Sequence, residues 1–304
     1  MGAGDQAILR RAASLAKTNQ AQLTVVDVIE ELPRDMRMLV VAITPMKLQE
    51  LIVQERREYL ERIAATLCKD GVQISVKVLT GTPFLEIIRQ VLRQKHDLLI
   101  MAAGGRSRLK ERLFGSTSLH LMRKCPCPVW LMKSTWRERF HRIMAAVDPM
   151  CVEEDKNPLN IQIMDLATSL AKIEQSELHI VHAWDFRGEH LLRVRSRMSS
   201  ETMNQLANQT REIHRKGFDG LIGNYQLKNL NHRLHLIKGD PAEQIIDLAA
   251  QHAIDLLVMG TVCRTGVAGF FIGNTAENVL QQVECSLLAV KPEGFVSPVR
   301  LLKK

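Results

Sequence analysis

Apolar positions along this chain alternate between short runs typical of buried strands and longer stretches with helical spacing. In the second half the strand pattern occurs five times, at 142–148, 178–184, 233–238, 255–259 and 287–291. Helical spacing or a helix start follows each of the first four runs, at 159–173, at 199–216, from Asp240 and from Asn274. Strands that alternate with helices predict a parallel sheet with right-handed crossovers.

The first half repeats this alternation. Strands are expected at 23–28, 72–79, 97–101 and 129–132, and helices at 8–17, 46–69, 83–95 and 116–123. The short polar segment 134–140 separates the halves, so we expect one domain over 1–134 and a second over 140–304. The tail from Pro292 is expected to be loose or draped on the surface.

The segment after the apolar run 255–259 has the order strand, glycine loop, helix start. Gly260 ends the run, and Gly273 precedes the next helix, with Asn274 as its expected N-cap and Glu277 in capping-box position. Backbone N–H groups point out of a helix start, and the helix dipole favours negative charge. The segment therefore predicts an anion site with phosphate as the candidate ligand. The competing interpretation is a tight turn and an N-cap.

The same segment occurs earlier in the chain. Its matched positions lie 158 residues apart: Asp97 and Asp255, Gly115 and Gly273, Lys133 and Lys291. A loop repeated in register, with matched flanking strands, predicts a duplicated domain. Ligands of such sheets sit outside the carboxyl ends of the strands. Asp148 ends the first strand of the second half and Gly260 ends the fourth, so both are expected to reach one crevice.

These residues resemble the universal stress protein family. Its nucleotide-binding members carry Gly-x2-Gly-x9-Gly-(Ser/Thr/Asn) after the fourth strand and an Asp at the end of the first. Here the spacing is Gly260, two residues, Cys263, nine residues, then Gly273 and Asn274. The resemblance covers nearly the whole chain, twice, and the second half is similar to tandem bacterial members of the family.

The resemblance implies an α/β chain of two tandem flavodoxin-like (adenine nucleotide alpha hydrolase-like) parallel-sheet domains with strand order 3-2-1-4-5. It implies a stress-induced regulatory protein that binds ATP or a related nucleotide, with Mg²⁺ as an accompanying ion. The second-half contacts that we expect are Asp148, Val181, Met259, Gly260, Cys263, Arg264, Gly273, Asn274 and Thr275. The first-half counterparts are Gly105, Arg106, Gly115, Ser116 and Thr117, where a structural vestige is the favoured interpretation. Tandem members mimic within one chain the dimer of single-domain members, which implies an intramolecular pseudo-dimer and leaves a further homodimer and protein partners open.

Both halves depart from the family pattern. Cys263 replaces the second glycine of the motif in the second half, and Ala102 replaces the first glycine in the first half. A larger departure follows from matching the Ser-Leu-Ala-Lys sequences that start at Ser14 and Ser169, 155 positions apart. Asp148 then maps to a position before residue 1, so the first half lacks its first strand and its Asp. Three alternatives follow: a broken sheet, a gap filled by another segment, or a longer natural protein.

Composition and charge argue against nucleic-acid-binding and membrane-spanning classes of protein. Net charge is +8, and Arg106, Arg108, Lys110 and Arg112 crowd the first glycine loop. This charge is consistent with attraction to phosphate or with a solvated loop. The chain has no aromatic interleaving and no helix-turn-helix or RNP pattern, which argues against nucleic acid. No apolar run approaches the roughly 20 residues needed to cross a bilayer, and no signal peptide opens the chain, so we expect a cytoplasmic protein.

No catalytic or metal-binding set is predicted. Cys125-Pro-Cys127-Pro lacks zinc spacing, and Cys127 is interpreted as a small buried hydrophobe. His179 and His182 alternate on one strand, and His232 and His235 flank another, but strand pairs do not show three or four convergent ligands. Without a Walker-type Asp, a nucleophile elbow or an identifiable base, ATP hydrolysis is expected to be slow or absent. The alternative function is a scaffold or carrier for another phosphorylated or apolar ligand.

Overall fold

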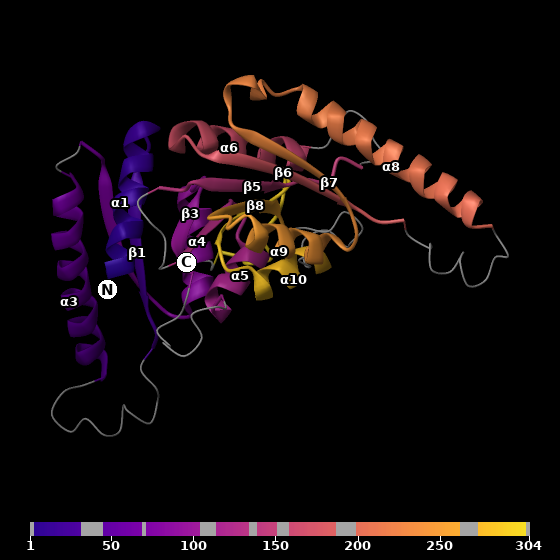
Figure 1. Cartoon of the computed structure of the whole chain (residues 1–304). Helices are drawn as coiled ribbons and strands as arrows, with labels where there is room; N and C mark the ends of the chain where they lie inside the picture. The colour runs from indigo at the N-terminus through magenta and orange to yellow at the C-terminus, as the bar shows by residue number, and fades with distance from the viewer. Residues whose placement is uncertain are drawn as a thin grey trace.

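The computed structural model describes residues 3–31, 45–68, 71–103, 114–133, 139–150, 158–186, 199–261 and 273–301 (Figure 1). The first half contains α1 (Ala3–Thr18), β1 (Leu23–Ile29), α3 (Pro45–Cys68), β2 (Ile74–Thr80), α4 (Pro83–Gln94), β3 (Leu99–Ala103), α5 (Ser116–Lys124) and β4 (Val129–Lys133). The second half contains β5 (Arg142–Ala146), α6 (Pro158–Glu174), β6 (Glu177–Trp184), α8 (Ser200–Gly223), η1 (Leu227–Asn229), β7 (His232–Lys238), α9 (Pro241–Gln251), β8 (Leu256–Gly260), α10 (Asn274–Gln282) and β9 (Ser286–Val290).

The second half forms a five-stranded parallel sheet with the order β7-β6-β5-β8-β9. Numbered within this half, that order is 3-2-1-4-5, so the flavodoxin-like fold class is confirmed. Helices α9 and α10 cover one face and α6 and α8 the other (Figure 1). Every residue of β9 is buried, which explains why its sequence reads as a continuous apolar run rather than an alternating one.

The sheet of the first half is broken. β1 pairs with β2 in parallel, from Leu23 opposite Ile74 to Ile29 opposite Thr80, as a separate two-stranded sheet. β3 pairs with β4 and extends the seven-stranded sheet instead. Of the three alternatives for the missing first strand, the structure shows a broken sheet within the described residues. Helix α1 packs against β3 and, less extensively, against β1, so it connects the two parts.

The two halves join through their last strands. β4 and β9 pair antiparallel, with Trp130 opposite Leu288, and these two residues are 158 positions apart, the spacing of the repeat. The copies are therefore related by a local pseudo-twofold axis that passes through this residue pair. Arg123 of α5 forms an ion pair with Glu277 of α10 across the same junction. The expected tandem pseudo-dimer is the arrangement found within the described residues.

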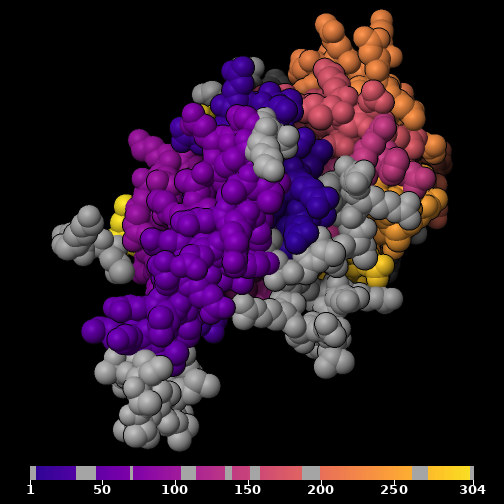
Figure 2. Space-filling model, turned by 90° about the vertical axis from the view of Figure 1, so that its left-hand side faces the viewer, coloured from indigo at the N-terminus to yellow at the C-terminus, as the bar shows by residue number. Residues whose placement is uncertain are grey.

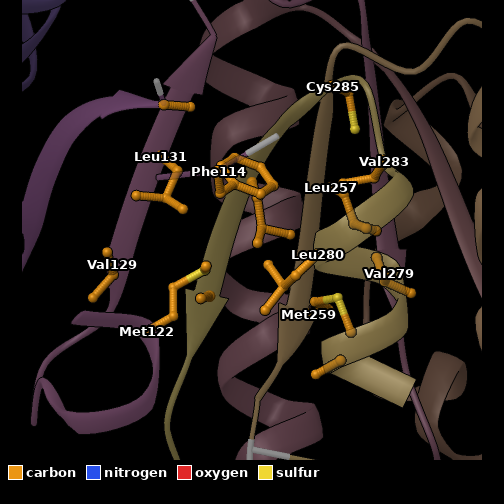
Figure 3. Close-up of a cluster of buried hydrophobic side chains, with 14 of the residues drawn as sticks. Phe114, Met122, Val129, Leu131, Leu257, Met259, Val279, Leu280, Val283 and Cys285 are labelled. Carbon is orange, nitrogen blue, oxygen red and sulfur yellow. The ribbon is translucent and has the colours of Figure 1, made fainter. Parts of the chain in front are cut away.

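A continuous hydrophobic cluster crosses the junction (Figure 3). Leu131 and Met122 come from the first half, and Leu257 and Val279 come from the second, all with no exposed surface. Full burial of a side chain of this size stabilises the fold by about 1.5–3 kcal/mol. Separating the halves would return these side chains to water, so the two domains share one core.

Helix α1 forms a second junction, on the other face of the sheet. Ile8 belongs to a buried cluster with Trp130 and Phe140. Arg11 forms an ion pair with Glu174, at the end of α6, and both side chains are largely buried. Figure 2 shows the indigo residues at the start of the chain between the purple part of the first half and the pink and orange second half.

Local signals set several helix ends. Asp240 caps α9 at the expected helix start, because its carboxylate accepts from the N–H groups of Ala242 and Glu243. The helix expected to end at residue 216 continues to Gly223, because Phe218 and Leu221 of its last turns are buried.

The tail is draped over the first half: the Ser297 hydroxyl donates to the Lys124 carbonyl at 2.7 Å. None of the described helices combines the length and the apolar character that crossing a membrane requires.

Candidate functional site

The candidate site lies where β8 ends and α10 begins. Both ends of the intervening loop are held together, because the Gly273 N–H donates to the Thr261 carbonyl at 3.0 Å. The Thr261 N–H donates in turn to the Val290 carbonyl of β9 at 3.2 Å. The loop therefore leaves and re-enters the fold at one point on the carboxyl edge of the sheet. Cys263 and Arg264 belong to this loop and lie outside the described residues.

The N-cap of α10 is Gly273, so the N-cap role expected for Asn274 was wrong, and so was the capping box with Glu277. Gly273 has the extended φ and ψ of −65° and 146°, and no side chain caps the helix. Glu277 instead pairs with Arg123. Asn274 is exposed and Thr275 is half-buried at the first two helical positions. The first-turn amides are therefore free of a capping side chain within the described part of the chain, which is the arrangement an anion requires.

A buried lysine supports the base of this loop. The Lys291 ammonium donates to the Thr261 hydroxyl at 2.6 Å and also to the Met122 carbonyl. The side chain is only 4% exposed, and burial lowers the pKa of its ammonium group to about 8. Its counterpart Lys133 is buried as well, and burial lowers the pKa of that group in the same direction. In the sequence this pair only sets the repeat, because the two partners of Lys291, which are Met122 and Thr261, lie 169 and 30 positions away along the chain.

Asp148 follows β5 at the same carboxyl edge of the sheet. Asn160 of α6 holds its backbone: the Asp148 N–H donates to the Asn160 Oδ1 at 3.0 Å, and the Asn160 amide donates to the Asp148 carbonyl at 2.7 Å. The Asp148 residue is exposed. This double hydrogen bond fixes where the chain leaves the sheet, and it leaves Asp148 exposed at the carboxyl edge.

A histidine pair that sequence reasoning missed lies near Asp148. His182 Nδ1 is 3.2 Å from the Val147 carbonyl, and His182 Nε2 is 2.8 Å from His214 Nδ1. Because the Val147 carbonyl can only accept a hydrogen bond, the proton of neutral His182 lies on Nδ1. The other ring nitrogen, Nε2, then accepts from His214. Burial lowers the pKa of His214, and the negative charge of Asp148 partly opposes this shift. The sequence does not reveal that His182 and His214 are neighbours, because they meet only where α8 packs over the end of β6.

Three other predicted residues lie within the sheet. Val181 is buried in β6, and its carbonyl accepts from the Val147 N–H at 3.0 Å. Met259 is buried in the shared core. Gly260 lies against Leu159: a Cβ there would lie 2.7 Å from Leu159 Cδ2, so the end of that flexible side chain would have to shift. Their ligand contacts stay predictions.

The first half reproduces the helix start of the second half. Gly115 is the N-cap of α5 with φ and ψ of −65° and 164°, close to the values of Gly273, and again no side chain caps the helix. Ser116 is exposed and Thr117 half-buried. Gly105 and Arg106 lie outside the described residues. Because the described chain has no first strand in this half, nothing in it corresponds to Asp148.

Comparison with known proteins agrees with this duplication. The sequence profile of the universal stress protein family matches residues 3–133 and again 139–291. The chain is 29% identical over 300 residues to universal stress protein E of Escherichia coli K12, covering 98% of this chain and 93% of that protein. It is 26% identical over 304 residues to universal stress protein E of Photorhabdus laumondii, covering 99% and 95%.

Two solved structures show the same fold along most of their length. A protein of unknown function from Pseudomonas aeruginosa PAO1 aligns with a TM-score of 0.72 at 22% identity, covering 94% of this chain and 88% of that one. A universal stress protein from Archaeoglobus fulgidus aligns with a TM-score of 0.63 at 19% identity, covering 96% and 95%.

Proposed function

Because the chain belongs to the universal stress protein family, we propose that it is a stress-response regulatory protein that binds ATP or a related nucleotide in its second half. The observation that carries the proposal is the start of α10. Its amides have no capping side chain, and the closed base of the loop holds them at the carboxyl edge of the sheet. Phosphate oxygens are suitable partners for such amides.

The surrounding charges support a polyphosphate. The Lys291 ammonium donates to Thr261, the last described residue before the loop, and its positive charge favours a negatively charged ligand nearby. Asp148 lies at the end of β5, in position to accept from a ribose or base, or to hold a Mg²⁺ ion that the phosphates also bind. We propose Arg264 and Cys263 as loop contacts, with Gly273, Asn274 and Thr275 at the helix start.

Hydrolysis is proposed to be slow or absent. Phosphoryl transfer needs a residue that positions the attacking water and cations that stabilise the transferring group. Within the described residues of the crevice, Asp148 is the carboxylate next to the sheet edge, and His182 and His214 are engaged with each other. The first half is proposed to act as a structural support rather than as an equal second site.

The duplicated chain provides a matched test. Gly273→Trp places a large side chain at the proposed phosphate position, and Gly115→Trp makes the same change at the equivalent N-cap of the first half. We expect equilibrium binding of labelled ATP with Mg²⁺ to the unaltered protein, loss of that binding in Gly273→Trp, and retention in Gly115→Trp. Circular dichroism checks that both variants remain folded. Lack of binding at millimolar ATP, or equal loss in the two variants, contradicts the proposal.

A groove in the first half favours the alternative function of a carrier. It encloses about 580 Å³ between α1 and α3 and is lined by Leu9, Ile63, Leu67 and Tyr59, together with Gln6, Arg10, Arg62 and Thr66. An apolar lining with two guanidinium groups suits an amphipathic anion. Mass spectrometry of molecules that co-purify with the protein distinguishes the two functions: nucleotide alone supports the first, and an acyl-chain anion without nucleotide supports the carrier.

A further inference from the structure

Three histidines converge at a place that the proposed nucleotide site does not use. His179 lies on β6, His235 on the neighbouring β7, and His252 immediately after α9. Each ring offers one nitrogen, and these three atoms all lie within 4.8 Å of one another. His179 has no exposed surface, whereas the other two rings are partly open to solvent. Sequence reasoning missed the cluster because His252 enters it only through the packing of α9 on the sheet.

The cluster is separate from the candidate nucleotide site. His179 is the third residue of β6, and His252 precedes β8, so these two rings lie towards the amino ends of the strands. Thr261 and Gly273 lie at the carboxyl edge. His179 shares the α9 face of the sheet with Val181, which packs in the same cluster as residues of α9.

The spacing of two rings suits one metal ion. His179 Nδ1 lies 3.1 Å from His235 Nε2. Two imidazole nitrogens bound to one tetrahedral Zn²⁺ at 2.0–2.1 Å lie about 3.3 Å apart. These two side chains therefore need little movement to share an ion. His252 has to swing inward, which its position at the end of a helix and its partial exposure permit.

A carboxylate lies behind the buried histidine. His179 Nε2 is buried without a hydrogen-bond partner among the described residues, and Glu177 Oε2 lies 3.6 Å from it. The other Glu177 oxygen accepts from Arg233 at 2.5 Å, which fixes the carboxylate. A proton on His179 Nε2 would face Glu177 and leave the lone pair of Nδ1 directed towards His235. Histidine ligands of metals almost always have such a carboxylate or carbonyl partner.

We propose that His179, His235 and His252 bind one divalent transition-metal ion, with Glu177 orienting His179 and a water completing the coordination. Three imidazoles and no direct carboxylate ligand suit Zn²⁺ and its late transition-metal neighbours and disfavour Mg²⁺ or Ca²⁺. The open fourth position faces solvent through the two partly exposed rings. The proposal is independent of nucleotide binding, because the two sites lie at different ends of the strands.

Calorimetric titration of the full chain with Zn²⁺, under a non-chelating reductant, tests the site. We expect one Zn²⁺ per chain, loss of stoichiometric binding in His179→Gln and His235→Gln, and at least about tenfold weaker binding in His252→Gln. Glu177→Gln is expected to weaken binding by about 10- to 100-fold through loss of the orienting carboxylate. His232→Gln is the matched control, because it removes a histidine of the same strand outside the cluster, and it should bind as the unaltered protein does.

Two further measurements keep the proposal open to refutation if a variant misfolds. Co²⁺ bound to the unaltered protein should show no thiolate charge-transfer band, since no cysteine belongs to the site. Crystals of the unaltered protein soaked in Zn²⁺ should give an anomalous peak among the three rings. A thiolate band, a peak elsewhere, or unchanged affinity in His252→Gln would overturn the three-histidine site.

Discussion

Lys291 places an ammonium group where water has little access. Its partners are the Thr261 hydroxyl and the Met122 carbonyl, and no carboxylate is among them. Burial therefore disfavours the charged form and lowers the pKa of the group to about 8. An ordinary lysine has a pKa of about 10.4. Between these two pH values the unfolded chain binds more protons at this position than the folded chain does.

This difference predicts a stability change with pH. The free energy of unfolding should rise as the pH increases from about 8 to about 10.4, by about 3 kcal/mol attributable to Lys291. Lys291→Met removes the titrating group, so its unfolding free energy should lack this increase. Urea unfolding of both proteins at pH 7.5 and 10, under reducing conditions, measures the difference. Lys172→Met on the exposed face of α6 is the control, and it should track the unaltered protein at both pH values. Equal pH dependence with and without Lys291 would contradict the prediction.

At the scale of elements, α1 connects the two parts of the broken first-half sheet. It packs against β3 and β1, and its Arg11 reaches Glu174 at the end of α6. Glu174 also accepts from the Phe140 N–H at 3.3 Å, and the Arg11 guanidinium lies over the Trp130 ring, 5.8 Å from its centroid. One buried ion pair thus joins the amino-terminal helix to the segment that starts the second half.

Glu174→Gln should destabilise the protein by about 3 kcal/mol, because it leaves the Arg11 guanidinium buried without its counter-charge. Arg215→Gln is the control: Arg215 and Asp219 form an exposed pair at 3.6 Å on α8, and its loss should change stability by less than about 1 kcal/mol. Chemical denaturation of the two variants gives both values. Similar effects from the buried and the exposed pair would show that α1 is not anchored in this way.

The sequence predicted which segments are helices and which are strands better than it predicted where each one begins and ends. The start of α9 could be predicted from Asp240 and Pro241, because an N-cap residue and a proline at the first helical position act on backbone groups that are close to them in the sequence. The expected start of α10 was misplaced by one residue, because Asn274 is a better intrinsic cap than Gly273. The hydrogen bond from the Gly273 N–H to Thr261 joins residues twelve positions apart and is not visible in the sequence. Lys291, His214 and His252 could not be assigned a role from the sequence, because their partners lie far away along the chain.

At the scale of the whole molecule, the break in the first-half sheet separates a strongly buried part from a weakly buried one. All residues of β4 and β9 are buried, whereas β1 has one buried residue and β2 has none. The sequence predicted the missing strand through the 155-residue match of Ser14 with Ser169. The sequence did not determine how the strands on either side of the missing strand would pair, because that depends on competition between strand pairing and the packing of α1.

This contrast predicts uneven hydrogen exchange. Backbone amides of β1 and β2 should exchange at least about tenfold faster than those of β4 and β9, because local opening of the two-stranded sheet exposes less apolar surface. Hydrogen–deuterium exchange with mass spectrometry of the intact chain measures both regions in one experiment. The pair β6 and β7 provides an internal reference within the larger sheet. Uniform protection across the first half would contradict the prediction.

The Trp130–Leu288 pair at the pseudo-twofold axis has a consequence for how such a protein can change. In a dimer of identical subunits, every substitution appears on both sides of the axis, so a change that removes a binding crevice removes both copies. Here each substitution appears once. One half can therefore lose its binding site and serve as a structural support while the other half retains its own. The two residues at the axis can also differ, as the indole of Trp130 and the isobutyl group of Leu288 do, which is impossible in a dimer of identical subunits.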